Sequence, residues 1–416
     1  MSKEISVAVI SESVGKSPEE VAYSFVFDEV YRLAKKGVNV HVVRGRIEGD
    51  SISYGINFHG IKKLIDPQAL NMLMENIMFY PPISLLRNLI YLYWENLYAS
   101  NVSKIVEKYK LDLIHAHFAY REGLVGLLAK RKQKKPLIVT IHGYDILIEP
   151  SVNFGIRRSM RYDALVRKVI RGSDALIVNS RAVYKEVLKV EPQAKNKLYL
   201  IPLGVDCNRF NPNIDRLSIR RRLGIEDKFI IFVLKAHEPR YRIEDVIRAA
   251  AIVIHHYNYS DVVFLIGGTG SLKDYHQNLS RKLNVSNNVI FLGKIPYDEL
   301  PLYYAACDIF VNPALGEGFG IVIAEAMATG KPVVAVKKFG PVDLILDGVN
   351  GFLVKPMSPQ EIADKIIYFV ENPEEVRRMG INGRKIVEER FDIQKRIEKI
   401  ISIYEEVLSA EHFGPV

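Results

Sequence analysis

Short apolar runs recur along the 416-residue chain and alternate with amphipathic stretches. Runs of this length, rich in β-branched residues, are typical of buried parallel strands, and the stretches between them are typical of crossover helices. The pattern predicts an α/β protein with two Rossmann-like halves, each presenting its strand C-termini to a shared crevice. The predicted strands cover 5–10, 38–43, 111–115, 137–141, 175–178, 198–201, 229–234, 262–266, 289–292, 309–311, 333–336 and 352–354.

The length of the chain predicts more than one hydrophobic core. A boundary is expected near 201–206, where a strand ends in Pro202 and Gly204. A last amphipathic helix, 392–409, carries Ile397, Ile400 and Tyr404 on one face. We therefore predict an N-terminal domain over 1–203, a C-terminal domain over 204–388, and a terminal helix within 389–416.

The net charge of +9 is unevenly distributed. Residues 1–205 hold 30 Lys and Arg against 20 Asp and Glu, whereas residues 206–416 hold 27 against 28. The basic excess indicates either a solvated surface or a surface that binds an anionic membrane or nucleic acid. Most of the excess comes from Lys130, Arg131, Lys132, Lys134, Lys135, Arg157, Arg158, Arg161, Arg167, Lys168 and Arg171.

No stretch approaches the roughly 20 apolar residues of a membrane span, and the first apolar run is too short for a signal peptide. Cys207 and Cys307 are lone thiols without metal-ligand spacing, so we expect a reducing, cytoplasmic location. The stretch 70–98 is rich in large apolar residues. Helical spacing there favours core packing, with an amphipathic surface on the cytoplasmic membrane face as the alternative.

The stretch 313–332 is predicted to run from loop to helix to strand, and it concentrates polar groups at a strand end. Gly318 and Gly320 loosen the backbone, so that the first N–H groups of the helix can turn toward an anion. Glu317 precedes the helix, and Glu325 follows eight residues later within an apolar segment. A carboxylate in that setting requires a partner or a ligand.

This stretch resembles the E-x7-E motif and following helix of family 4 glycosyltransferases. Three further segments, 325–328, 330–334 and 347–354, fall in that family's order and spacing. The resemblance implies a GT-B fold and retaining transfer from a nucleotide-sugar donor. It also implies that Glu317 holds sugar hydroxyls and Glu325 the ribose hydroxyls, that the donor lies on Gly318, Phe319, Gly320 and Ile321, and that the terminal helix crosses back to the first domain.

Two histidine segments end strands of the first half. His115 and His117 are spaced like a metal pair, but no Asp, Glu or Cys set stands near them in the sequence, so strand-end packing is favoured and no metal is expected. The segment 141–145 resembles the family's H-G-x-D segment. The resemblance implies that His142 lies beside the reacting sugar, whereas a lone strand-end histidine is otherwise structural.

The strand end after 229–234 carries Lys235 and Arg240, where the family reads G-R-x4-K-G. The charges are retained although the residue types differ, so the phosphate contacts are expected to be rearranged. The glycines of 267–270 lack the spacing of a dinucleotide fingerprint. The resemblance also implies that the backbone at Lys294 and Ile295 meets the nucleobase. The loop 11–18 keeps only Gly15 where relatives carry two glycines, which removes the expectation of a donor contact there.

These observations predict a retaining, metal-independent hexosyltransferase that uses a nucleotide-diphosphate sugar and a glycan or lipid-linked acceptor. No cofactor is expected. Departure of the diphosphate requires cations and N–H dipoles, for which Lys235 and Arg240 are the candidates. The alternatives are a sugar-phosphate-acceptor transferase, a nucleotide-sugar 2-epimerase, and a basic membrane- or nucleic-acid-binding module. The missing interleaved aromatics disfavour nucleic acid, and the acceptor-binding residues, donor base and oligomeric state stay open.

Overall fold

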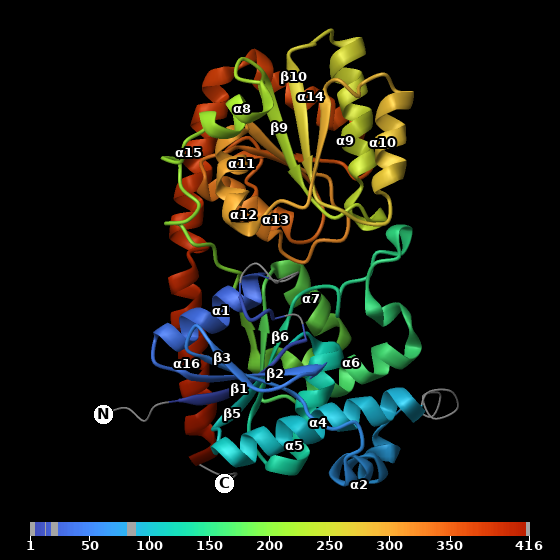
Figure 1. The fold of residues 1–416 in the computed structure, drawn as a ribbon, viewed down its shortest axis with the longest axis vertical. Helices are drawn as coiled ribbons and strands as arrows, with labels where there is room; N and C mark the ends of the chain where they lie inside the picture. The colour runs from blue at the N-terminus through green and yellow to red at the C-terminus, as the bar shows by residue number, and fades with distance from the viewer. Residues whose placement is uncertain (1–4, 13, 18–23, 81–88, 413–416) are drawn as a thin grey trace. The chain divides into compact units, whose positions relative to one another are not determined.

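The computed structural model describes residues 5–12, 14–17, 24–80 and 89–412, drawn as a ribbon in Figure 1. The chain divides into two compact units. Unit 1 contains the residues up to 148, residues 155–202 and the segment from 394 onward. Unit 2 contains residues 149–154 and 203–393. Each unit is described by itself below.

Unit 1 is built on an eight-stranded sheet in the order β3-β4-β2-β1-β5-β6-β7-β8. Neighbouring strands are parallel except β3, which runs antiparallel to β4. The chain therefore winds outward in both directions from β1 and β5, and the carboxyl ends of these central strands form a topological switch point. The strands are β1 (Ser6–Ile10), β2 (Asn39–Ile47), β3 (Ser51–Ser53), β4 (Ile56–Ile61), β5 (Leu113–His117), β6 (Leu137–Ile141), β7 (Ala175–Val178) and β8 (Leu198–Leu200).

The helices of unit 1 connect these strands, and one of them arrives from the end of the chain. They are α1 (Ser24–Lys35), α2 (Pro67–Asn76), α4 (Leu89–Tyr109), α5 (Leu124–Gln133), α6 (Met160–Gly172), α7 (Arg181–Val190) and α16 (Ile393–His412). Short helical turns are η2 (Ile77–Phe79), η3 (Ala119–Gly123), η5 (Ile156–Arg158) and η6 (Pro192–Lys197).

Unit 2 contains a six-stranded parallel sheet in the order β11-β10-β9-β12-β13-β14. The sheet lies between α9 and α10 on one side and α8 and α11 on the other (Figure 1). Its strands are β9 (Phe229–Leu234), β10 (Val262–Gly267), β11 (Val289–Gly293), β12 (Ile309–Asn312), β13 (Val333–Val336) and β14 (Gly351–Val354).

Its helices are α8 (Leu217–Leu223), α9 (Ile243–Ala251), α10 (Lys273–Lys282), α11 (Leu300–Ala306), α12 (Ile321–Ala328), α13 (Pro341–Leu344), α14 (Pro359–Glu371) and α15 (Pro373–Arg390). Short helical turns are η4 (Pro150–Val152), η7 (Pro239–Tyr241), η8 (Ile252–His256) and η9 (Tyr297–Glu299).

The two parallel α/β sheets confirm the predicted fold class. Each of the twelve apolar runs forms a strand within a few residues of its predicted bounds. The strands β3 and β4 were missed, because Asn57, His59 and Gly60 interrupt the apolar run of β4. His59 is buried there and its Nε2 lies 2.9 Å from Nδ1 of His41, which satisfies a polar group that the apolar pattern does not anticipate.

The terminal helix α16 presents one apolar face. Ile397, Ile400 and Tyr404 are fully buried on it. The helix begins at Ile393, and the segment from 394 onward belongs to unit 1. The residues up to 148, residues 155–202 and the end of the chain therefore share one hydrophobic core.

The apolar stretch 70–98 divides between core and surface. Met72 and Leu92 are buried, whereas Met74, Met78 and Ile90 are more than 70% exposed. Its segment 81–88, like Ser13 and Pro18 of the loop 11–18, lies outside the described residues. Among the helices that the structure describes, none has the length and apolar character needed to cross a membrane.

Candidate functional site

Loops at the carboxyl edge of the unit 2 sheet bring Lys235 and Glu317 together. Lys235 follows directly after β9, and Glu317 lies in the loop that leaves β12. These are neighbouring parallel strands, so both loops emerge at the same edge of the sheet. The Lys235 ammonium forms an ion pair with the Glu317 carboxylate, and Lys235 is buried. Two residues that the sequence analysis singled out separately thus form one charged pair.

Arg240 lies in η7, beside this pair. Its guanidinium lies 4.6 Å from the ring centre of Tyr241, and the Lys235 ammonium lies 5.2 Å from the same ring. The Arg240 carbonyl accepts a hydrogen bond of 2.9 Å from the N–H of Leu315, which ties η7 to the following glycine loop. Burial, followed by the charge of Glu317, raises the pKa of the Tyr241 phenol. A neutral aromatic ring therefore lies next to two cations.

The loop from Gly318 to Ile321 leads into α12. Gly320 has a φ of +102°, a conformation that side chains rarely adopt. The backbones of Gly340 and Phe319 approach so closely that a Cβ at position 340 would lie 2.4 Å from the Phe319 Cα. The first N–H groups of α12 are therefore held in place by packing, and N–H groups at a helix start carry partial positive charge.

Glu325 lies in the second turn of α12. Its exposed fraction is 7%, and its Oε2 accepts a hydrogen bond of 2.7 Å from the hydroxyl of Tyr304 on α11. The sequence analysis predicted that this carboxylate needs a partner but did not identify Tyr304. That tyrosine is part of an apolar helix, and only the packing of α11 against the sheet shows its role.

Lys294 and Ile295 follow β11 at the same edge of the sheet, where Lys294 is exposed and Ile295 is buried. The N–H of Gly268 donates a hydrogen bond of 2.7 Å to the carbonyl of Gly293, which joins this loop to the end of β10. Cations, backbone N–H groups and carboxylates thus line the carboxyl edge of one sheet. Such a set can bind an anionic group next to hydroxyl groups.

His142 lies in unit 1, immediately after β6. Asp145 accepts hydrogen bonds from the backbone N–H groups of His142 and Gly143, at 3.1 and 2.8 Å, and so fixes the loop. The imidazole contacts the rings of Phe25 and Phe118, with centroid distances of 5.1 and 4.5 Å. Burial is the main cause that lowers the pKa of His142 well below its ordinary value, so the ring is neutral.

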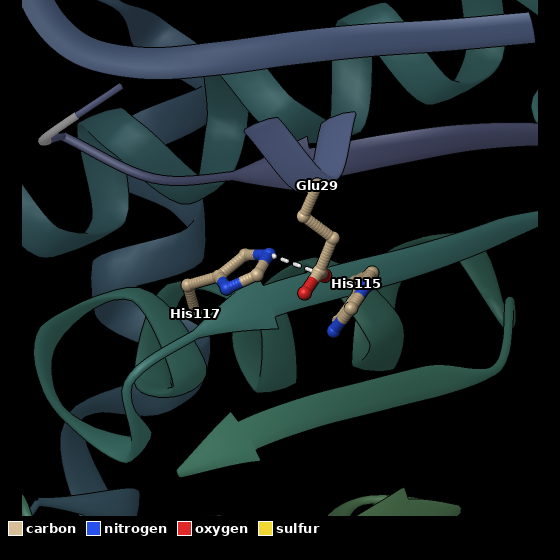
Figure 2. Close-up of side chains that lie close together, drawn as sticks. All are labelled: Glu29, His115 and His117. Carbon is tan, nitrogen blue, oxygen red and sulfur yellow. Dashed lines mark ion pairs between the residues drawn. The ribbon is translucent and has the colours of Figure 1, made fainter. Parts of the chain in front are cut away.

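His115 and His117 lie on β5, and the structure adds an acidic neighbour that the sequence analysis missed. Figure 2 shows Glu29 of α1 above the two histidines, and the nearest ligand atoms of all three lie within 4.8 Å of one another. Glu29 precedes His115 by more than 80 positions, so local spacing could not reveal it. The two histidines therefore have an acidic neighbour in the folded protein, contrary to the expectation from the sequence, while the absence of a metal stays a prediction.

Much of the basic excess of unit 1 is paired internally. Lys130 binds Asp174 at 2.6 Å, and Arg171 binds Glu191 at 2.7 Å. These pairs remove several cations from the count available to an anionic partner. Arg131, Lys132 and Lys134 are exposed on and after α5.

Comparison with known proteins identifies both units. The family model described as Glycosyltransferase Family 4 matches residues 24–209, and the model described as Glycosyl transferases group 1 matches residues 215–386. An uncharacterised glycosyltransferase of Methanocaldococcus jannaschii is 28% identical over 81% of this chain and 86% of its own length.

Two further proteins are similar over most of the chain. The UDP-Gal:alpha-D-GlcNAc-diphosphoundecaprenol alpha-1,3-galactosyltransferase of Escherichia coli is 26% identical over 72% of this chain and 77% of its own length. The crystal structure of HepE of Anabaena in complex with UDP covers 97% of this chain and 100% of its own, with a TM-score of 0.74 and 22% identity. The two family models together span most of the chain, which therefore belongs to the family 4 glycosyltransferases, nucleotide-sugar-dependent enzymes of the GT-B fold.

Proposed function

We propose that this protein is a retaining hexosyltransferase that moves a sugar from a nucleotide-diphosphate donor to a glycan or lipid-linked acceptor without a metal. The observation that carries the proposal is the convergence of Lys235 and Arg240 at the carboxyl edge of the unit 2 sheet, beside the start of α12. Two cations and one carboxylate, Glu317, leave a net positive charge that favours a diphosphate.

The chemistry places negative charge on the leaving diphosphate and positive charge on the sugar as the glycosidic bond breaks. Preorganised cations and N–H dipoles stabilise the first of these charges. In the proposed arrangement Lys235 and Arg240 neutralise the diphosphate, Glu317 holds sugar hydroxyls and Glu325 holds the ribose hydroxyls. His142 hydrogen-bonds a sugar hydroxyl near the reacting carbon. The acceptor then attacks from the face that the diphosphate leaves, which retains the configuration.

The donor proposal is tested by thermal unfolding with UDP-, GDP- and ADP-sugars, with and without EDTA. Stabilisation by one nucleotide that survives EDTA is expected. Lys235→Ala and Glu325→Gln are each expected to reduce transfer at least about ten-fold. Lys228 forms an ion pair with Asp261 at the opposite end of β9, so Lys228→Ala is the matched control. Full activity of both site variants, or loss of binding in EDTA, would contradict the proposal.

A lipid-linked acceptor is favoured by an exposed apolar surface on unit 1. A pocket of about 280 Å³ is lined by Met72 and Glu75 of α2 and by Arg131 and Lys132 of α5, so the helix that carries exposed Leu70 and Met74 adjoins the exposed basic run. Apolar side chains next to cations are typical of a surface that docks on anionic lipid. The exposed apolar residues are Leu64, Ile65, Leu70, Met74, Ile77, Met78, Leu89, Ile90 and Tyr91.

Co-sedimentation with vesicles tests this docking. We expect binding to anionic vesicles that weakens as salt rises, and weaker binding by Met74→Glu and Ile90→Glu. Ile381→Glu on unit 2, which changes another exposed isoleucine, is the control. Equal, salt-resistant binding to neutral vesicles would exclude the electrostatic part of the proposal.

A further inference from the structure

A chain of four buried polar side chains runs through unit 1 and ends at His142. Arg396 comes from α16, Glu29 from α1 and His117 from the end of β5, and each of the four is at most 8% exposed. We call these residues, Arg396, Glu29, His117 and His142, the unit 1 relay. Figure 2 shows its middle step, in which the Glu29 carboxylate faces the imidazole of His117.

The distances define the order of the relay. Nε and Nη2 of Arg396 lie 2.8 and 2.6 Å from Oε2 of Glu29. The other carboxylate oxygen, Oε1, lies 3.5 Å from Nε2 of His117, an electrostatic contact that is too long for a hydrogen bond. Nδ1 of His117 lies 3.1 Å from Nε2 of His142. A charged carboxylate held by arginine thus stands at one end, and a pair of imidazoles stands at the other.

The position of each ring proton follows from these contacts. Burial lowers the pKa of His117 to about 3 and that of His142 well below its ordinary value, so each neutral ring carries one N–H. A proton on Nδ1 of His117 would turn the lone pair of Nε2 toward the Glu29 carboxylate, which is electrostatically unfavourable. His117 therefore carries its proton on Nε2, and its Nδ1 accepts from Nε2–H of His142.

The remaining nitrogen of His142 points to a ligand. Nδ1 of His142 is buried and has no hydrogen-bond partner among the described residues. A buried acceptor without a partner is costly unless something binds to it. We propose that Arg396, Glu29 and His117 are positioning residues, which fix His142 in the Nε2–H tautomer so that its Nδ1 accepts a hydrogen bond from a donor sugar hydroxyl. The identity of the bound group rests on the function proposed above.

A metal ion explains the same cluster less well. Both ring nitrogens of His115 are already occupied, Nδ1 by the Tyr404 hydroxyl and Nε2 by the Thr140 hydroxyl, each at 2.7 Å. The Arg396 guanidinium holds the Glu29 carboxylate and would repel a cation at that place. A metal would therefore have to displace several hydrogen bonds and tolerate a buried positive charge.

The tautomer is measured on the free protein by NMR with ¹⁵N-labelled histidine, assigned through a His142→Asn variant. The expected spectrum has protonated Nε2 and unprotonated Nδ1 in both His117 and His142. The opposite tautomer in His142 would overturn the proposal. A shift of the His115 and His117 signals by Zn²⁺ would also overturn it, because the cluster would then be a metal site.

Two variants at one position separate positioning from folding. In His117→Asn the carboxamide oxygen can replace Nδ1 as the acceptor, whereas in His117→Leu no acceptor remains. We expect His117→Leu to lower kcat about ten-fold with little change in KM, and His117→Asn to stay within about three-fold of the parent. Tyr404→Phe removes an equally buried hydrogen bond outside the relay and is expected to leave kcat unchanged.

Deoxy-sugar donors complete the test. With the donor that lacks the contacted hydroxyl, the parent and His117→Leu are expected to have equal rates, because nothing remains for Nδ1 to accept. A ten-fold difference for every donor would overturn the proposal. The NMR result needs no substrate, so a correct tautomer in a protein that binds no nucleotide sugar would contradict the proposed function and leave the relay intact.

Discussion

Each unit contains a chain of arginine, glutamate and two histidines, and the two chains differ in how the sequence assembles them. In unit 2, Nη1 of Arg242 lies 2.6 Å from Oε1 of Glu244, and Oε2 of Glu244 lies 3.5 Å from Nε2 of His276. Nδ1 of His276 lies 2.9 Å from Nδ1 of His237, which follows β9. We call these four residues the unit 2 relay. Its order of groups matches that of the unit 1 relay.

The arginine distinguishes the two relays. Arg396 and Glu29 are separated by 367 positions, and both side chains are 2% exposed. Arg242 and Glu244 belong to one loop and helix start, with side chains 23% and 12% exposed. The unit 1 relay therefore holds the C-terminal helix against the first helix of the chain, whereas the unit 2 relay stabilises a local turn. The same ion pair of arginine and glutamate thus connects distant parts of the chain in unit 1 and stabilises a local turn in unit 2.

The histidine ends also differ. Nδ1 of His142 is buried without a partner among the described residues, whereas His237 has no ring nitrogen in that condition. Of the two terminal histidines, only His142 thus has a buried ring nitrogen that a ligand could hydrogen-bond. The comparison indicates that a histidine at a strand end can bind a ligand when one ring nitrogen has no partner. The residues that hydrogen-bond the other nitrogen then determine how firmly the ring is held.

Acid is expected to produce the largest difference between the units. Burial lowers the pKa of His115 and His117 to about 3 and that of His142 well below 6.5, whereas in unit 2 it lowers that of His237 to about 4. Below pH 6.5 these imidazoles bind protons in the unfolded chain but stay neutral in the folded protein. The free energy of unfolding is therefore highest above pH 6.5 and decreases as the pH falls below that value. Each such histidine costs about 2 kcal/mol at pH 5. Hydrogen exchange at pH 7 and 5 is expected to show greater loss of protection in unit 1.

Three carboxyl groups of unit 1, Glu95, Glu122 and Asp145, work in the opposite direction, because burial raises the pKa of each. Burial raises the pKa of Glu122 to about 7, so its protonation stabilises the folded state as the pH falls and offsets about one histidine. Burial also lowers the pKa of His41, to about 4, and that of His59, so the histidines of unit 1 still leave it more sensitive than unit 2. Equal loss of protection in both units, or an earlier loss in unit 2, would contradict the assignment of neutral buried rings to the unit 1 relay.

Removal of the arginine is expected to give the next largest effect. Arg396→Met leaves the Glu29 carboxylate buried and unpaired, which costs about 3–5 kcal/mol of the free energy of unfolding. Arg242→Met breaks the pairs of a more exposed arginine with Glu244 and Asp245 and is expected to cost less than Arg396→Met. Urea unfolding of both variants measures the two values. Similar losses would show that the long-range pair contributes no more than the local one.

The sequence predicted the elements of both relays far better than their assembly. Apolar runs located β5 and β9, and with them the strand-end positions of His117 and Lys235, because buried parallel strands have a strong local pattern. Glu29 lies within an amphipathic helix, where an acid usually means a solvated face. Its contact with Arg396 depends on the packing of the two ends of unit 1. No local pattern encodes that contact.

The candidate site of unit 2 was more accessible to sequence reasoning. Lys235, Arg240 and Glu317 each stand next to a strand or a glycine loop, and parallel strand order brings their loops to one edge. The hydrogen bond between Tyr304 and Glu325 was not foreseen, because α11 gives no signal of its own. Residues on loops at strand ends can therefore be predicted, whereas the side chains that support them from neighbouring helices require the tertiary structure.

Replacement of the terminal histidines is expected to give the smallest free-energy effect and to distinguish the relays by function. His142→Ala removes the proposed acceptor for a sugar hydroxyl and is expected to lower kcat about ten-fold, or about 1.4 kcal/mol of transition-state stabilisation. His237→Ala removes the end of the local relay and is expected to lower kcat less than about three-fold. Transfer assays at saturating donor measure both variants.

The comparison of His142→Ala with His237→Ala tests which feature identifies a functional histidine, its burial or a ring nitrogen without a hydrogen-bond partner. His142 and His237 are both nearly inaccessible and both contact a second histidine. If burial and histidine pairing were sufficient, the two variants would lose activity equally, and the unpartnered Nδ1 of His142 would be a packing defect. If only His142→Ala lowers kcat, the free nitrogen is the functional group, because it is the feature that His237 lacks.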